Sequence, residues 1–119
     1  MTENTNYFED FELLSITNEL LRQMGGIRSI CLMTGAHNFK YFEEDNCAVT
    51  FWEFKGSKSY NFVKILLKPN DTYKMIIGQK RKVQGIPTLK EKVIEEELYC
   101  DNIKKRYEEI TGLYLTLFP

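Results

Sequence analysis

The chain has 119 residues, of which 43% are hydrophobic, 28% charged and 13% aromatic, with a net charge of −1. These proportions are typical of a globular protein and exclude a chain that is disordered throughout. No stretch approaches the roughly 20 apolar residues of a membrane span, and the polar N-terminus lacks the pattern of a signal peptide. We therefore expect a single soluble cytoplasmic domain over residues 1–119, with residues 1–5 flexible.

The first expected element is a helix that ends at Gly25–Gly26. Asn6 and Glu9 have the spacing of a capping box, and glycine readily adopts the left-handed conformation that closes a helix. The apolar residues recur at spacings of three and four, which predicts one buried stripe. They are Leu13, Ile16, Leu20 and Met24.

Short β-rich runs separated by turn residues follow, and they predict five strands. The expected strands are 27–33, 39–42, 48–54, 60–67 and 73–78. The loops between them are short, so sequential neighbours should pair antiparallel. In the fourth run, alternation directs Val63, Ile65 and Leu67 into the core against the helices.

The segment 89–99 fits two structures. Its lysine and glutamate content favours a helix, whereas residues 92–99 also fit a sixth, edge-type strand, which we prefer. Asp101 then caps a short helix that ends at Thr111–Gly112, and the apolar tail 113–118 packs back on the domain. The expected fold class is α+β, with an antiparallel sheet of five or six strands packed against an N-terminal and a C-terminal helix.

The charges are divided unequally along the chain. Residues 1–54 carry nine acidic and three basic side chains, residues 55–92 carry two acidic and ten basic ones, and residues 93–119 carry six acidic and three basic ones. If the fold keeps these segments apart, the molecule has one positive and one negative face. The acidic runs 43–45 and 95–97 would then lie opposite the basic surface and could imitate phosphates.

Few residues offer catalytic or metal-binding chemistry. There is one histidine, His37, and the three cysteines Cys31, Cys47 and Cys100 are widely spaced, as is typical of a reducing compartment. Neither a Walker loop nor another glycine-rich phosphate motif occurs. We expect no metal, no cofactor and no enzyme activity; the alternative is a small enzyme that uses the loop 34–38 with His37 as its base.

The basic middle segment is the candidate binding surface. Lysines beside aromatic rings on an exposed sheet face suit nucleic acid, because phosphates release counterions and bases stack on the rings. An alternative is that the rings merely cover the sheet while the lysines keep it soluble. The candidate residues for binding nucleic acid or a nucleoprotein are Lys55, Lys58, Tyr60, Phe62, Lys64, Lys74, Lys80, Arg81 and Lys82.

Three short segments carry a resemblance to known proteins. They are a Gly-Gly helix end at 25–26, Met-Thr-Gly-Ala-His-Asn-Phe at 33–39 and Thr-Gly-Leu-Tyr at 111–114. The chain resembles a family of small proteins of bacteriophages and mobile elements over residues 11–117, although it departs from that family at 85–87 and 95–97. The resemblance implies an α+β fold with a central antiparallel sheet, a strand at 92–99 and a host bacterial cytoplasm, and it transfers no catalytic residue.

The resemblance also implies a function. Small non-catalytic phage proteins often bind and disable host defence enzymes, so we expect a protein that binds a host nucleoprotein and inhibits antiviral defence. The sharpest form is an anti-CRISPR protein that acts on an RNA-guided nuclease or its guide RNA. The alternatives are an RNA- or DNA-binding accessory protein of phage nucleic-acid metabolism and a scaffold that dimerises through an open sheet edge. No membrane partner is expected.

Overall fold

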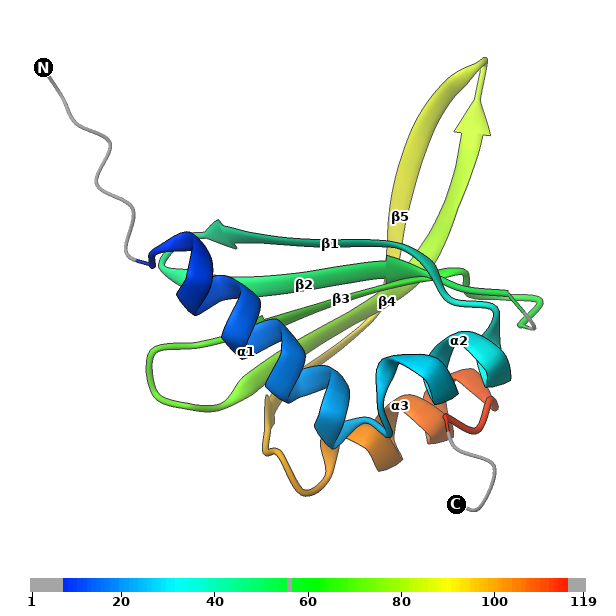
Figure 1. Cartoon of the computed structure of the whole chain (residues 1–119). Helices are drawn as coiled ribbons and strands as arrows, with labels where there is room; N and C mark the ends of the chain where they lie inside the picture. The colour runs from blue at the N-terminus through cyan, green and yellow to red at the C-terminus, as the bar shows by residue number, and fades with distance from the viewer. Residues whose placement is uncertain (1–7, 56, 116–119) are drawn as a thin grey trace, which may run out of the picture.

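The computed structural model describes residues 8–55 and 57–115 and shows three helices and one five-stranded sheet (Figure 1). The fold class is α+β, as the sequence predicted. The helices are α1 (Asp10–Gln23), α2 (Ile27–Thr34) and α3 (Ile103–Thr111). The strands are β1 (His37–Glu44), β2 (Cys47–Glu53), β3 (Phe62–Leu67), β4 (Tyr73–Val83) and β5 (Ile86–Leu98).

The sheet is a simple meander. Its strand order is β1-β2-β3-β4-β5, and each strand pairs antiparallel with the next one along the chain. All three helices lie on one side of this sheet, and the far half of the β4–β5 hairpin rises away on the other side (Figure 1). The strand predicted at 92–99 is confirmed, but it begins earlier, at Ile86.

The main core lies between the helices and the sheet. Trp52, Val63 and Ile65 are fully buried there, as alternation predicted for β3, and they pack with Leu20 of α1 and Tyr107 of α3. The described part of the apolar tail, 113–115, also returns to this core, where Leu115 is fully buried, while residues 116–118 lie outside the described residues. The helix-facing side of the sheet is therefore closed by the chain itself.

The first of the predicted strands, 27–33, is wrong: these residues form helix α2. A strand would bury residues two apart, such as Ile30 and Leu32, whereas the structure buries Ile30 with Thr34 and leaves Leu32 81% exposed. Gly26 turns the chain after α1 with a φ of 92°. A short apolar run has too few residues for its period to distinguish the two structures.

The start of α1 also lies later than the capping-box pattern predicted. The helix begins at Asp10, and the backbone N–H of Glu9 donates to the carboxylate of Glu12 at 2.9 Å. Asn6 and residues 1–5 lie outside the described residues. At the other end of the chain, α3 ends at Gly112 in the left-handed conformation, as predicted.

The face of the sheet opposite the helices, here called the open face, has a small apolar centre. Val49, Leu66 and Ile76 form a buried cluster on it, and the rings of Phe51 and Phe62 stack with their centroids 5.6 Å apart. No helix of the described residues covers this face (Figure 1). Within the described residues, no helix has the length and apolar character needed to cross a bilayer.

Candidate nucleic-acid interface

The β4–β5 hairpin extends beyond the rest of the sheet as a two-stranded ribbon, defined here as residues 79–92. Residues 81–92 are all exposed. The ribbon carries one acidic side chain, Glu91, and five basic ones. The basic residues are Lys80, Arg81, Lys82, Lys90 and Lys92.

The ribbon leaves the sheet at Gly78. A Cβ atom on Gly78 would lie 2.0 Å from the backbone carbonyl oxygen of Lys90 and 2.9 Å from the ring of Phe62, so only glycine fits. On the opposite strand, the register shifts between the pairs Ile77–Val93 and Gly78–Glu91, which leaves Lys92 as an extra residue. A bulge of this kind bends and twists a strand, so it directs the ribbon out of the sheet.

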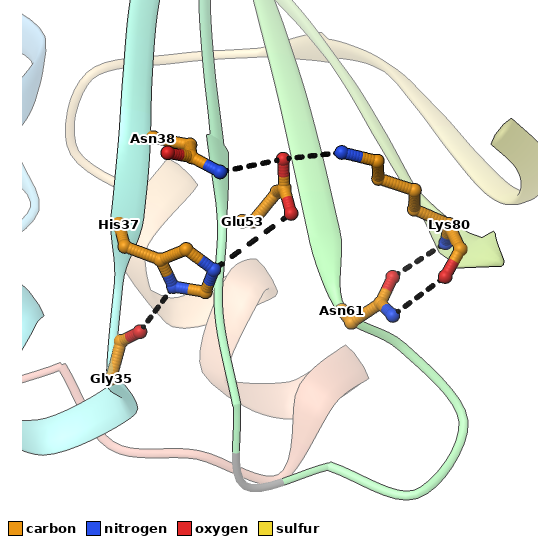
Figure 2. A network of polar contacts seen from close by, with 6 residues as sticks. All are labelled: Gly35, His37, Asn38, Glu53, Asn61 and Lys80. Carbon is orange, nitrogen blue, oxygen red and sulfur yellow. Dashed lines mark hydrogen bonds and ion pairs between the residues drawn. The ribbon is translucent and has the colours of Figure 1, made fainter. Parts of the chain in front are cut away.

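Asn61 holds the base of the ribbon on the β4 side. Its side-chain oxygen accepts a hydrogen bond from the backbone N–H of Lys80 at 2.6 Å, and its side-chain amide donates to the carbonyl oxygen of Lys80 at 2.9 Å (Figure 2). Strand β3 begins only at Phe62, so the Asn61 side chain takes the place of a further strand residue beside β4. The ribbon therefore begins from a fixed position.

Glu53 at the end of β2 joins the ribbon to β1. Its carboxylate accepts hydrogen bonds from Lys80 Nζ at 3.0 Å and from Asn38 Nδ2 at 3.2 Å (Figure 2). Burial alone would raise the pKa of Glu53, but the hydrogen bonds from Lys80 and Asn38 outweigh it and hold the pKa below its ordinary value. Lys80 is therefore a structural cation of the ribbon base.

The β2–β3 loop supports the other strand of the ribbon. Lys92 Nζ donates to the carbonyl oxygen of Ser59 at 3.2 Å and lies 6.0 Å from the ring centroid of Tyr60. Tyr60 itself packs against the helix-side core. Two of the five ribbon cations, Lys80 and Lys92, are thus used to hold the ribbon in place.

The remaining three cations, Arg81, Lys82 and Lys90, point into solvent. All three are exposed, and none has an ion-pair or hydrogen-bond partner among the described residues. Cations on a protruding element attract phosphates when few carboxylates lie near them, and Glu91 is the one acidic side chain of the ribbon. The structure thus brings part of the predicted basic surface together at one place.

Other lysines of the predicted surface are neutralised. On the open face, Lys64 pairs with Glu44 at 2.9 Å and Lys74 lies 4.0 Å from Glu96. These carboxylates come from the first and last segments of the chain, so the expectation of separate positive and negative faces is wrong for the sheet. The ribbon cations Arg81, Lys82 and Lys90 have no such carboxylate partner among the described residues.

The aromatic residues predicted for stacking are not exposed as expected. Phe62 is 1% exposed beneath Phe51, and Tyr60 belongs to the loop before β3 and packs toward the helices. Lys55 and Lys58 lie in that same loop, exposed and away from any strand. The two rings predicted for stacking, Tyr60 and Phe62, are therefore not available to bases on the open face.

A shallow groove of about 140 Å³ lies where the ribbon meets the open face. Lys40 and Phe51 line it from the sheet, and Lys80, Pro87 and Leu89 line it from the ribbon. The ribbon therefore leans over the open face and shares a concave surface with it.

His37 is placed where both of its ring nitrogens face protein oxygens. Nδ1 donates to the carbonyl oxygen of Gly35 at 2.8 Å, and Nε2 lies 3.8 Å from the carboxylate of Glu53, to which it is ion-paired when protonated (Figure 2). Within residues 8–55 and 57–115, no three His, Cys, Asp or Glu side chains are grouped to hold a metal ion.

Several residues of this interface were not predicted from the sequence. Lys90 lies in the basic segment, but its pairing with Gln79 places it beside Arg81 only in the folded ribbon. Gly78 and Asn61 carry no local signal of their roles, because these depend on a neighbouring strand. The sequence signal for the hairpin is the dipeptide Gln84–Gly85, because glycine is common in two-residue hairpin turns. In the structure both residues of this turn have positive φ angles, 54° and 81°.

No protein-family model, curated protein or solved structure matches the chain.

Proposed function

We propose that this protein is a non-enzymatic phage or prophage protein that attaches to a host nucleoprotein through the β4–β5 ribbon and inhibits antiviral defence. The observation that carries the proposal is the set of three exposed, unpartnered cations, Arg81, Lys82 and Lys90, on a braced and protruding element. Such a set suits the phosphates of a nucleic acid that a second protein also holds.

The sharpest form of the proposal is an anti-CRISPR protein. An RNA-guided nuclease holds its guide RNA and its target DNA in positively charged channels. A cationic ribbon would compete with these channels for the same phosphates. The phage origin that this form requires comes from the resemblance of segments 25–26, 33–39 and 111–114. The polar contacts of Glu53 serve the ribbon base, since its carboxylate accepts hydrogen bonds from Lys80 and Asn38.

The alternative function is an RNA- or DNA-binding accessory protein of phage nucleic-acid metabolism. The same unpartnered cations favour it, because phosphate attraction does not require a host protein. The two functions differ in what they do in an immunised cell. An inhibitor restores phage growth, whereas an accessory protein binds nucleic acid without changing immunity.

A plating experiment tests the proposal. Bacteria that carry an RNA-guided nuclease programmed against a phage would express the chain, the ribbon variant Arg81→Glu/Lys82→Glu, or the control Arg28→Glu/Lys105→Glu. The control makes the same charge change on the helix side, at two exposed residues without ion-pair partners among the described residues. We expect the wild type and the control to restore plaques and the ribbon variant to fail; equal plating by all three would refute the proposal.

A further inference from the structure

Two apolar side chains beside the turn at the tip of the ribbon are exposed. Val83 and Ile86 pair directly across the Gln84–Gly85 turn and are 47% and 64% exposed. Positive φ angles at both turn residues make a tight hairpin that matches the natural twist of the two strands. Directly behind this turn the ribbon thus presents a narrow pair of apolar side chains, Val83 and Ile86, called here the wedge.

The cations form a collar directly behind this wedge. The register pairs Gln79 with Lys90 and Arg81 with Thr88, so Arg81 and Lys90 share one face of the ribbon with Val83 and Ile86. Lys82, paired with Pro87, lies on the other face. Arg81 and Val83 are two residues apart, a spacing of about 7 Å along a strand.

We propose that the ribbon binds a B-form DNA duplex, with the Val83–Ile86 wedge inserted between base pairs from the minor groove and the collar on the flanking phosphates. Apolar side chains that enter a base step from this groove partly unstack it and kink the duplex. The inference rests on the proposed function and deepens it: the nucleic acid that the ribbon reaches is the DNA on which the host nucleoprotein acts.

The side chains of the ribbon favour duplex DNA over other nucleic acids. Single strands are held mainly by stacking on aromatic rings, and residues 79–92 contain none. Double-stranded RNA is recognised by polar contacts to 2′-hydroxyl groups across a wide, shallow groove, and Val83 and Ile86, which flank the turn residue Gln84, have no hydrogen-bonding side chain for such contacts. A kinked DNA step uses both parts of the ribbon, since the wedge fills the opened step while the collar contacts the phosphates on either side of the minor groove.

Energy transfer between dyes at the two ends of a short DNA duplex tests the inference. We expect the wild type to bind and kink this probe by about 20–90°. The variant Val83→Ser/Ile86→Ser keeps the collar, so it should bind with affinity reduced severalfold and leave the duplex straight. Because both residues are exposed, its thermal unfolding should match the wild type. The variant Arg81→Glu/Lys82→Glu should lose binding itself.

Three results would overturn the inference: binding without kinking by the wild type, equal kinking by the wedge variant, or equal affinity for a single strand or an RNA duplex of the same sequence. The proposed function is tested separately by plating. If the ribbon charge variant fails to restore plaques while the duplex stays straight, the function stands and the DNA wedge is wrong. In that case, loss of plating by the wedge variant would identify the tip as a contact to the host protein.

Discussion

The side-chain amide of Asn61 hydrogen-bonds both backbone groups of Lys80, at 2.6 and 2.9 Å, one residue before strand β3 begins and at the base of the ribbon. This contact replaces one residue of strand pairing and fixes the direction in which β4 leaves the sheet. The candidate interface depends on this direction. Cations that are already held in place lose less conformational entropy when they bind phosphates.

Replacement of Asn61 by Ala should loosen the ribbon base. Two partly buried hydrogen bonds are lost, at a cost of about 1–2 kcal/mol in the free energy of unfolding. Amide hydrogen exchange should show the Lys80 N–H losing protection, while the N–H groups of the sheet centre keep theirs. Asn61→Asp provides the comparison: it retains the acceptor for the Lys80 N–H but places a second oxygen against the Lys80 carbonyl. Unchanged protection in Asn61→Ala would show that the clamp is not formed.

Gly78→Ala should destabilise the protein by about 2 kcal/mol or more, because the added Cβ would lie 2.0 Å from a backbone oxygen of Lys90. Gly85→Ala is the matched control. It adds a Cβ at a left-handed residue with nothing within 4 Å, so it should cost only about 1 kcal/mol. Denaturant unfolding measures both, and equal costs would mean that the close approach of the two strands at Gly78 is absent.

Acid should weaken the fold through Glu53. Its pKa is lowered in the folded protein, so its contribution to stability is complete above the ordinary carboxyl pKa of 4.5 and is lost as the pH falls through the lower folded value. Glu53→Gln should therefore unfold more readily at neutral pH, yet lose less stability between neutral and acid pH than the wild type.

Denaturant titrations across that pH range measure this difference. Glu91→Gln, at an exposed carboxylate without a partner among the described residues, should leave the wild-type dependence unchanged. A Glu53→Gln protein with the same acid dependence as the wild type would show that Lys80 and Asn38 do not hold this carboxylate in its charged form.

Tyr107→Phe should leave the protein as stable as the wild type or stabilise it slightly. The Tyr107 hydroxyl and the Trp52 indole N–H are buried without a hydrogen-bond partner among the described residues, and an unpaired buried polar group costs about 1–3 kcal/mol. Thermal unfolding checks this, with the exposed Tyr99→Phe as control. A loss of stability of more than about 1 kcal/mol would mean that the two groups bond to one another.

The sequence predicted the parts of the fold that depend on local pattern. The alternating residues Val63 and Ile65 enter the core as expected, and Gly112 ends α3. The pattern was insufficient at 27–34, where burial of Ile30 with Thr34 is decided by packing against α1 and the sheet. Local signals determine an element most reliably when it is long enough to show its period.

The binding surface was predicted only in part, for a related reason. Whether a lysine is free depends on which carboxylate the strand register brings beside it: Lys64 meets Glu44 and Lys80 meets Glu53, from strands that are distant in sequence. Arg81 and Lys82 remain without such a partner because the ribbon extends past every other strand. That extension follows from Gly78 and the bulge at Lys92, neither of which is marked in the sequence.

The affinity for a short DNA duplex as a function of salt tests the central claim, that the ribbon cations contact phosphates, most directly. Each phosphate contact adds about 0.9 to the slope of log affinity against log salt concentration for B-form DNA. Arg81→Glu/Lys82→Glu should bind more weakly and lower the slope by about 2, whereas Arg28→Glu/Lys105→Glu should match the wild type. Equal slopes and equal affinities for all three proteins would contradict the account.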